Sequence, residues 1–240
     1  MAFKKFIQKI KTSFRDNLLT KLIFLIYIPT LILLVFVKLI SFYKMVGITL
    51  FTQDPGAVAT SQEFGASINK NLSPFVGIIS QIGILSWSMT ASLCIFCSAI
   101  IYQKKDISNN LAYFLGFFGF VTSILLLDDL LLLHELILPL LFKIPEELVY
   151  LCYGSLILWG LIRFKTVILQ TEWIILLLSF LWFGCSIFID TFSFYSYLKD
   201  LEYFLEDAFK LFGIVSWFYY FLTVCLKTVK KSTQNRNKLN

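Results

Sequence analysis

Six long apolar runs, separated by short polar turns, constrain the fold of this chain more than any other feature of its sequence. Crossing a bilayer takes roughly 20 apolar residues in a helix. A transmembrane β-barrel would instead alternate apolar and polar residues in segments of about ten. Hydrophobic residues make up 58% of the chain, and the mean hydropathy is +0.79. We therefore predict an all-α, polytopic transmembrane helical bundle of about six spans. The expected spans are residues 22–42, 75–102, a third that starts at 111, 146–161, 173–192 and 203–226.

The lysines and arginines gather on one side of these spans. Fifteen of the 21 lie in the N-terminal segment, in the turns after the second and fourth spans, and in the C-terminal tail. Cytoplasmic segments of membrane proteins are enriched in Lys and Arg. We therefore expect both termini in the cytoplasm and the long loop 43–74 outside. A charge pattern of this kind indicates topology, and no nucleic-acid partner is expected.

The N-terminal segment, residues 1–21, is predicted to be a basic amphipathic helix. Phe3, Phe6, Ile7 and Ile10 recur at helical spacing, and lysines fill the gaps between them. A helix of this kind lies on an anionic membrane surface. The chain then divides into this interfacial helix, a six-span domain over residues 22–226 and a basic cytoplasmic tail over residues 227–240, with the lipid bilayer as a partner.

One span carries an unusual set of ionisable groups. The stretch LLLDDLLLLHELILPLL, residues 125–141, places Asp128, Asp129, His134 and Glu135 among thirteen other residues that are all apolar. An Asp at the centre of a span costs about 2.5–3.5 kcal/mol to insert, whereas a leucine returns only about half a kcal/mol. The leucines therefore allow insertion but give no reason for the acids, which call for a functional explanation.

Other ionisable residues fall in the same outer half of the membrane under this topology. Intramembrane charges usually face the bundle interior and pair with one another. We therefore predict a polar site near the outer mouth, with a divalent metal as a candidate cofactor. We expect Asp128 or Glu135 to lie within about 6 Å of Asp190, Glu206 or Lys210, because charges at that range shift each other. The candidate metal or cation ligands are Asp128, His134, Glu135, Asp190 and Glu206, and the supporting polar residues are Asp129, Asp207 and Lys210.

The geometry of the third span has two interpretations. On one helix Asp128 and Glu135 share a face, but residues 110–142 would run about 50 Å against a core of about 30 Å. Alternatively, the span ends near residue 130, and a second short helix follows that is bent at or near Pro139. Both aspartates would then lie at the outer interface. The two glutamates that follow Pro145 are expected to be helix-start residues rather than site residues.

Three stretches together resemble an uncharacterised family of bacterial six-span membrane proteins, found in cyanobacteria and proteobacteria. They are GIISQIGILSW within residues 74–87, LLLDDLLLLHE within 125–139, and LEDAFKLFGIVSW within 205–221. The likeness covers residues 51–226 and implies a bacterial inner or thylakoid membrane, but no known activity. A weaker likeness is to seven-span zinc hydrolases of the alkaline-ceramidase type. Those enzymes use three histidines, and this chain has one.

Three functions follow from these residues and stay open, as does the question of whether the protein is an enzyme. In the first case, the outward-facing cluster of carboxylates and histidine binds a cation or metal and can support hydrolase activity on lipid. Alternatively, the protein is a proton- or cation-coupled transporter whose carboxylates carry the ion. In the third case it is a non-catalytic assembly protein with a membrane protein partner, and the cluster only holds helices together.

Overall fold

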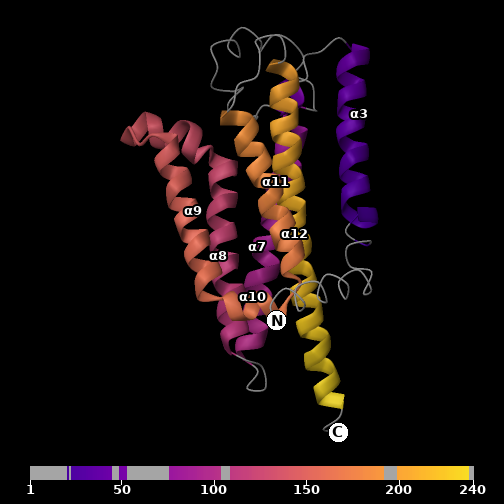
Figure 1. Ribbon diagram of the computed structural model, residues 1–240, viewed down its shortest axis with the longest axis vertical. Coiled ribbons are helices and arrows are strands. Elements are labelled where there is room, and N and C mark those ends of the chain that lie inside the picture. The colour runs from indigo at the N-terminus through magenta and orange to yellow at the C-terminus, as the bar shows by residue number, and fades with distance from the viewer. Residues whose placement is uncertain are drawn as a thin grey trace, which may run out of the picture.

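The computed structural model describes residues 21, 23–44, 49–52, 76–103, 109–191 and 199–237. The predicted surface helix at 1–21, most of the outer loop and the last tail residues lie outside these ranges. Throughout the described residues the ordered structure is helical, as predicted (Figure 1). Its elements are η1 (Ile23–Tyr27), α3 (Ile28–Lys44), α4 (Thr49–Thr52), α7 (Ile78–Tyr102), α8 (Asn109–Leu131), η2 (Leu133–Phe142), α9 (Glu146–Arg163), α10 (Lys165–Gln170), α11 (Trp173–Thr191) and α12 (Lys199–Asn237).

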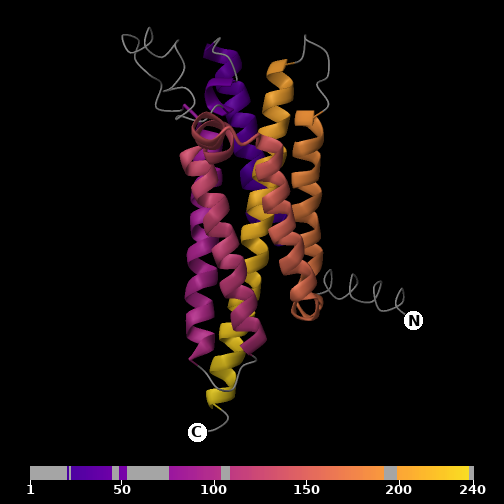
Figure 2. The ribbon, with the colours of Figure 1, turned by 90° about the vertical axis from the view of Figure 1, so that its left-hand side faces the viewer.

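The long helices alternate in direction along the axis of the bundle (Figures 1 and 2). α3 runs antiparallel to the first half of α12, and its start lies beside the middle of that longer helix, where Tyr27 contacts Ser216. Antiparallel contacts fix the directions. For α7 and α8 they are Trp87 with Asp129 and Ser98 with Ala112. For α9 and α8 they are Tyr153 with Asp128 and Trp159 with Phe117. Against α12, Tyr27 of η1 contacts Ser216 and Lys38 of α3 contacts Phe204. Also against α12, Thr171 just before α11 contacts Tyr220, and Ser179 of α11 contacts Gly213.

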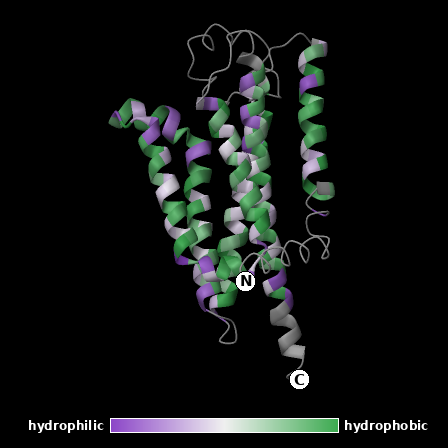
Figure 3. Cartoon of the chain, in the orientation of Figure 1, coloured by the Kyte–Doolittle hydropathy of each residue, from purple (hydrophilic) through white to green (hydrophobic). Residues whose placement is uncertain are grey.

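Five helices of the described chain are long and apolar enough to cross a membrane: those over Phe24–Tyr43, Ile78–Tyr102, Asn109–Leu131, Trp173–Thr191 and Leu201–Lys230. The predicted fourth span corresponds to α9, which has 18 residues and carries Glu146, Glu147 and Arg163 at its ends. Figure 3 shows apolar residues along the long helices and hydrophilic residues gathered toward their ends. The protein is therefore compatible with a multi-pass membrane protein.

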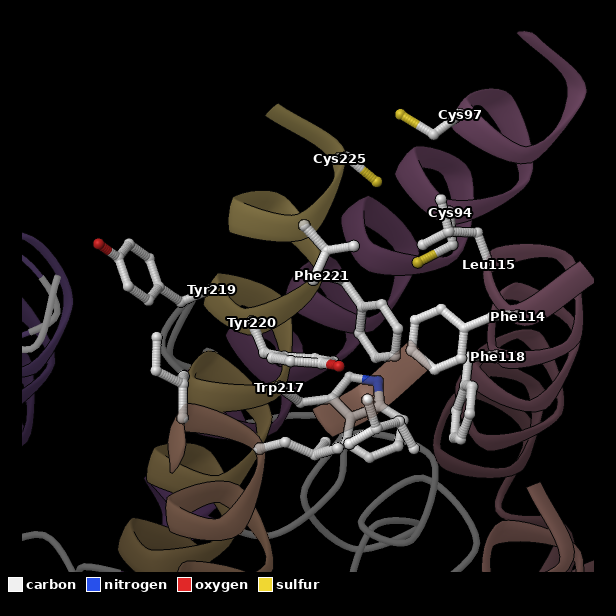
Figure 4. Packing of buried hydrophobic residues seen from close by; sticks show 14 of the residues in the cluster. Cys94, Cys97, Phe114, Leu115, Phe118, Trp217, Tyr219, Tyr220, Phe221 and Cys225 are labelled. Carbon is white, nitrogen blue, oxygen red and sulfur yellow. The ribbon is translucent and has the colours of Figure 1, made fainter. Parts of the chain in front are cut away.

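The centre of the bundle is rich in aromatic side chains, and α12 supplies more of them than any other described helix. Trp217 and Phe221 of α12 are almost fully buried and pack against Phe114 and Phe118 of α8 (Figure 4). The ring centroids of Trp217 and Phe118 are 5.8 Å apart, and those of Phe118 and Phe221 are 5.6 Å apart. The indole N–H of Trp217 donates to Thr122 Oγ1 at 3.1 Å, which satisfies the one polar atom of this ring.

The third apolar run is two helices rather than one. α8 ends at Leu131, the chain turns at Leu132, and η2 then runs roughly across the end of the bundle, so that Figure 2 views it nearly end-on. The break lies at Leu132, whereas the bend near Pro139 predicted for a second short helix does not divide η2. Pro139 has no N–H to donate, and it is accommodated within a wide π-type segment in which the N–H of Ile137 donates to Leu132 O.

Candidate functional site

The carboxylate of Asp128 is the centre of a buried polar cluster where α8 meets η2. Asp128 is 4% exposed, and its Oδ2 lies 2.5 Å from Nδ1 of His134. Its Oδ1 accepts hydrogen bonds from the backbone N–H of His134 at 3.1 Å and from the hydroxyl of Tyr153 at 2.9 Å. Tyr153 belongs to α9, so this one carboxylate joins three helices. Hydrogen bonds to an ionised group are roughly twice as strong as neutral ones.

The turn at Leu132 brings His134 back over Asp128. Leu132 has a φ of 51° and a ψ of 46°, in the left-handed region. That conformation costs roughly 1–2 kcal/mol for a residue with a Cβ atom. On a straight helix His134 and Asp128 would project in different directions. The turn removes this separation, and Asp128 then caps the first turn of η2 by accepting the N–H of His134.

The second ring nitrogen of His134 faces two more carboxylates. Its Nε2 lies 3.4 Å from Oε1 of Glu135 and 3.9 Å from Oε1 of Glu146. The hydroxyl of Tyr150 donates to the same Glu146 oxygen at 2.7 Å, and its ring centroid is 5.1 Å from that of His134. His134 is 4% exposed, whereas the Glu135 and Glu146 side chains are 38% and 44% exposed. The cluster thus reaches from the interior to the surface.

Electrostatics keep this histidine charged at neutral pH. Burial alone would lower the pKa of His134, but the hydrogen bonds to Asp128 and Glu135 outweigh it and raise the pKa to about 10. The hydrogen bond from His134 lowers the pKa of Glu135, although burial of the carboxyl opposes the change. An imidazolium surrounded by carboxylates is therefore the stable form of the site.

A second polar cluster links α7, α8 and α12. Asp129 accepts a hydrogen bond from the indole N–H of Trp87 at 2.8 Å, and its other oxygen lies 3.1 Å from Nζ of Lys210. The ion pair that joins the third and sixth predicted spans is therefore made by Asp129. A small cavity of about 20 Å³ adjoins this pair, with Ser80 and Asp207 in its lining. A space of that size holds about one water molecule.

The remaining predicted residues lie around the same end of the bundle. Asp190 is exposed near the end of α11. Glu206 is half-buried on α12 and interacts electrostatically with Asp190, Lys210, Glu135 and Glu146. Their contribution to the clusters is through charge at a distance. Within the described part of the chain, no group of three or more His, Cys, Asp or Glu side chains has the arrangement of a ready metal site.

Sequence reasoning missed four residues of the two clusters. Glu146 was expected only to begin a helix, yet its carboxylate also approaches His134. Its spacing from Tyr150, four residues along α9, is a local signal that would have found that pair. Tyr153 and Trp87 depend on helix pairing, which a single sequence does not reveal.

The chain was compared with known protein families, curated proteins and solved structures over its whole length. No curated protein and no solved structure matches the chain. One family model matches residues 23–224, from η1 into the second half of α12, and it is described as a domain of unknown function, DUF8692. Because this match covers most of the sequence and both polar clusters, the chain belongs to the DUF8692 family.

Proposed function

We propose that this protein binds a cation at the outer end of its membrane domain, between His134, Glu135 and Glu146. The single observation that carries the proposal is the orientation of His134. Its Nδ1 is held by the buried carboxylate of Asp128, which leaves Nε2 facing the two glutamates. A carboxylate that fixes one ring nitrogen in this way is the usual support for a histidine that binds a metal through the other.

The distances are compatible with a shared ion. Two ligand atoms that each lie about 2.0–2.2 Å from a zinc ion are at most about 4.4 Å apart. The separations from Nε2 of His134 to Glu135 and Glu146, 3.4 and 3.9 Å, fall below that limit. Both glutamates are partly exposed and can move toward an arriving ion. In the absence of metal, the proton on His134 is the resident cation, and a divalent ion would compete with it for Nε2.

Local charge also favours a cation. Three carboxylates, those of Asp128, Glu135 and Glu146, surround a single imidazole. Carboxylates at this spacing repel one another unless a cation or proton intervenes. Hydrolysis of lipid or ion-coupled transport would both use such a site, so the binding experiment comes before any assay of activity.

The proposed orientation places this cluster on the outer side of a bacterial inner or thylakoid membrane. It rests on the 15 of 21 basic residues that fall in the predicted cytoplasmic segments. Cysteines introduced in the predicted outer loop should react with an impermeant maleimide added to intact cells, whereas those in residues 227–240 should not. Labelling of the tail from outside would overturn this topology.

Calorimetric titration of the purified, chelator-treated protein with Zn²⁺ or Mn²⁺ tests the cation site. We expect one site per chain, lost in Glu135→Gln/Glu146→Gln and weakened by about 10–100-fold in Asp128→Asn, which removes the support of the histidine. Asp190→Asn is the matched control, since Asp190 is an exposed acid at the same end of the bundle. Equal affinity in the wild type and the double glutamine variant would refute the proposal.

A second function has its own supporting observation. Every hydrogen bond that Asp128 accepts comes from another element, either η2 or α9. The same cluster therefore suits a non-catalytic assembly protein that keeps α9 in place for a membrane partner. In that case the Asp128 and His134 variants would lose stability, and no metal would bind to the wild type.

A further inference from the structure

The last turn of η2 carries three consecutive large apolar side chains that contact little of the protein. Leu140, Leu141 and Phe142 are 74%, 72% and 66% exposed. The first half of the same segment differs, because His134 is 4% exposed and bound to Asp128. One end of η2 is thus anchored to the bundle by a polar contact, and the other end presents an apolar tip.

The depth of this tip follows from the helices on either side. α8 spans 23 residues, about 34 Å, which is slightly more than the hydrocarbon core of about 30 Å. Its end at Leu131 therefore lies at the boundary between the core and the headgroups. η2 turns there and runs roughly perpendicular to the long axis of the bundle, as Figure 2 shows. A helix that lies across the end of a span runs within the interfacial layer.

Energetics decide which surroundings suit the tip. Moving a fully exposed Leu or Phe side chain out of water is worth about 1.5–3 kcal/mol. The neighbouring Lys143 is also exposed, beside the three apolar residues. A lysine at this depth can extend its ammonium group to lipid phosphates while its methylenes stay among the acyl chains. An apolar tip with an adjacent lysine has the pattern of an interfacial anchor.

The tip also continues a surface that lipid already covers. Leu130 and Leu131 at the end of α8 are 53% and 49% exposed, and Leu151 near the start of α9 is 65% exposed. These side chains belong to helices on the outside of the bundle, which face the bilayer. The tip is joined to them through η2, so it is an extension of the lipid-facing surface rather than an isolated patch in water.

We propose that η2 is an interfacial helix whose tip, Leu140 to Phe142, inserts into the outer leaflet. The occupant of this surface is membrane lipid. The insertion fixes the height of η2 and, with it, the level of His134 relative to the headgroups. This inference does not depend on whether the cluster around His134 binds a cation.

Photocrosslinking tests the proposal in the complete protein, reconstituted into vesicles of phosphatidylethanolamine and phosphatidylglycerol. Phe142 is replaced with p-benzoylphenylalanine, a conservative change at an exposed ring. The lipid-facing control carries the same replacement at Phe120, which is 60% exposed in the middle of α8. Leu141 provides a second tip position, so that the test does not depend on one variant. Mass spectrometry identifies each adduct after irradiation.

We expect lipid adducts at position 142 with a yield within about twofold of that at position 120, as for a residue in the acyl boundary. The same result is expected at position 141. Adducts to a second copy of this chain in place of lipid would overturn the proposal and make the tip a dimer contact. Absence of any adduct at both tip positions, with lipid adducts still formed at position 120, would overturn it too, because the benzophenone reacts with C–H bonds and finds none in water.

Discussion

Replacing His134 with leucine is expected to destabilise the protein strongly, because the change leaves Asp128 as a buried carboxylate without its closest partner. Asp128 is 4% exposed and loses the contact of 2.5 Å to Nδ1. It keeps the bonds from the backbone N–H at position 134 and from Tyr153. Removing one partner of a buried ion pair costs about 3–5 kcal/mol. Since two of the three bonds survive, the lower end of that range is expected.

The double variant Asp128→Leu/His134→Leu separates the pair from simple loss of packing. Replacing both partners of a buried ion pair with apolar residues is often neutral or stabilising. The double variant should therefore be more stable than His134→Leu alone, with a coupling energy of about 2–3 kcal/mol. Hydrogen bonds between membrane helices average only about 0.6 kcal/mol in double-mutant cycles. A value near that average would mean that the pair contributes no more than an ordinary hydrogen bond between membrane helices.

The free energies of unfolding of the wild type, Asp128→Leu, His134→Leu and the double variant are measured in mixed micelles with increasing dodecyl sulfate. Tryptophan fluorescence follows the unfolding. The Asp129→Asn variant is the control for the loss of an acid at the adjacent position, which belongs to the other cluster. If the two single losses simply add, with a coupling energy below about 0.5 kcal/mol, Asp128 and His134 do not act as a pair. Asp128 and His134 would then not form a stabilising buried ion pair.

Raising the pH should progressively remove the stability advantage of the wild type over His134→Gln. Because the pKa of His134 is raised from 6.5 to about 10, its protonation stabilises the fold fully below pH 6.5, and this stabilisation is lost as the pH passes about 10. A pH-independent difference would contradict the raised pKa. Gly160→Ala should cost about 1–3 kcal/mol of stability, because the new Cβ would lie 2.3 Å from a ring carbon of Phe117 in α8. A Cβ at position 154 would meet nothing within 4 Å, so Gly154→Ala should be neutral. Thermal unfolding compares the two variants. Lys210→Met should cost about 1–3 kcal/mol in the same assay, because it leaves the partly buried Asp129 short of a bond. Lys227 is more exposed, and Lys227→Met should cost under about 1 kcal/mol.

The architecture could be predicted because membrane insertion depends on local composition. Continuous apolar runs are enough to indicate α7, α9 and α11 near their observed bounds, and α8 and α12 near their starts. The helix α12 continues to Asn237, beyond the predicted end of the sixth span at residue 226. The division at Leu132 was harder to place, because a leucine gives no sequence signal for a left-handed turn. A single helix over residues 110–142 would be longer than the membrane core is thick, and this mismatch correctly favoured two helices.

The candidate site was predictable only in part. Clustering of charge identified Asp128, His134 and Glu135 as residues that need partners, and His134 contacts both carboxylates. Which residue crosses to α12 depends on helix rotation, and neighbouring aspartates point about 100° apart on a helix. Asp129 therefore reaches Lys210, a pairing that a single sequence does not distinguish from one with Asp128.

The central place of α12 has a consequence for biogenesis. Its aromatic residues Trp217, Tyr220 and Phe221 lie in the middle of the bundle, yet the ribosome makes this helix after α3, α7, α8, α9 and α11. Until it arrives, α7 and α8 can pair with each other, but their inner faces stay exposed to lipid or to the insertion machinery. Nascent chains stalled before residue 199 should therefore be sensitive to membrane proteases, and release of the complete α12 should make them resistant.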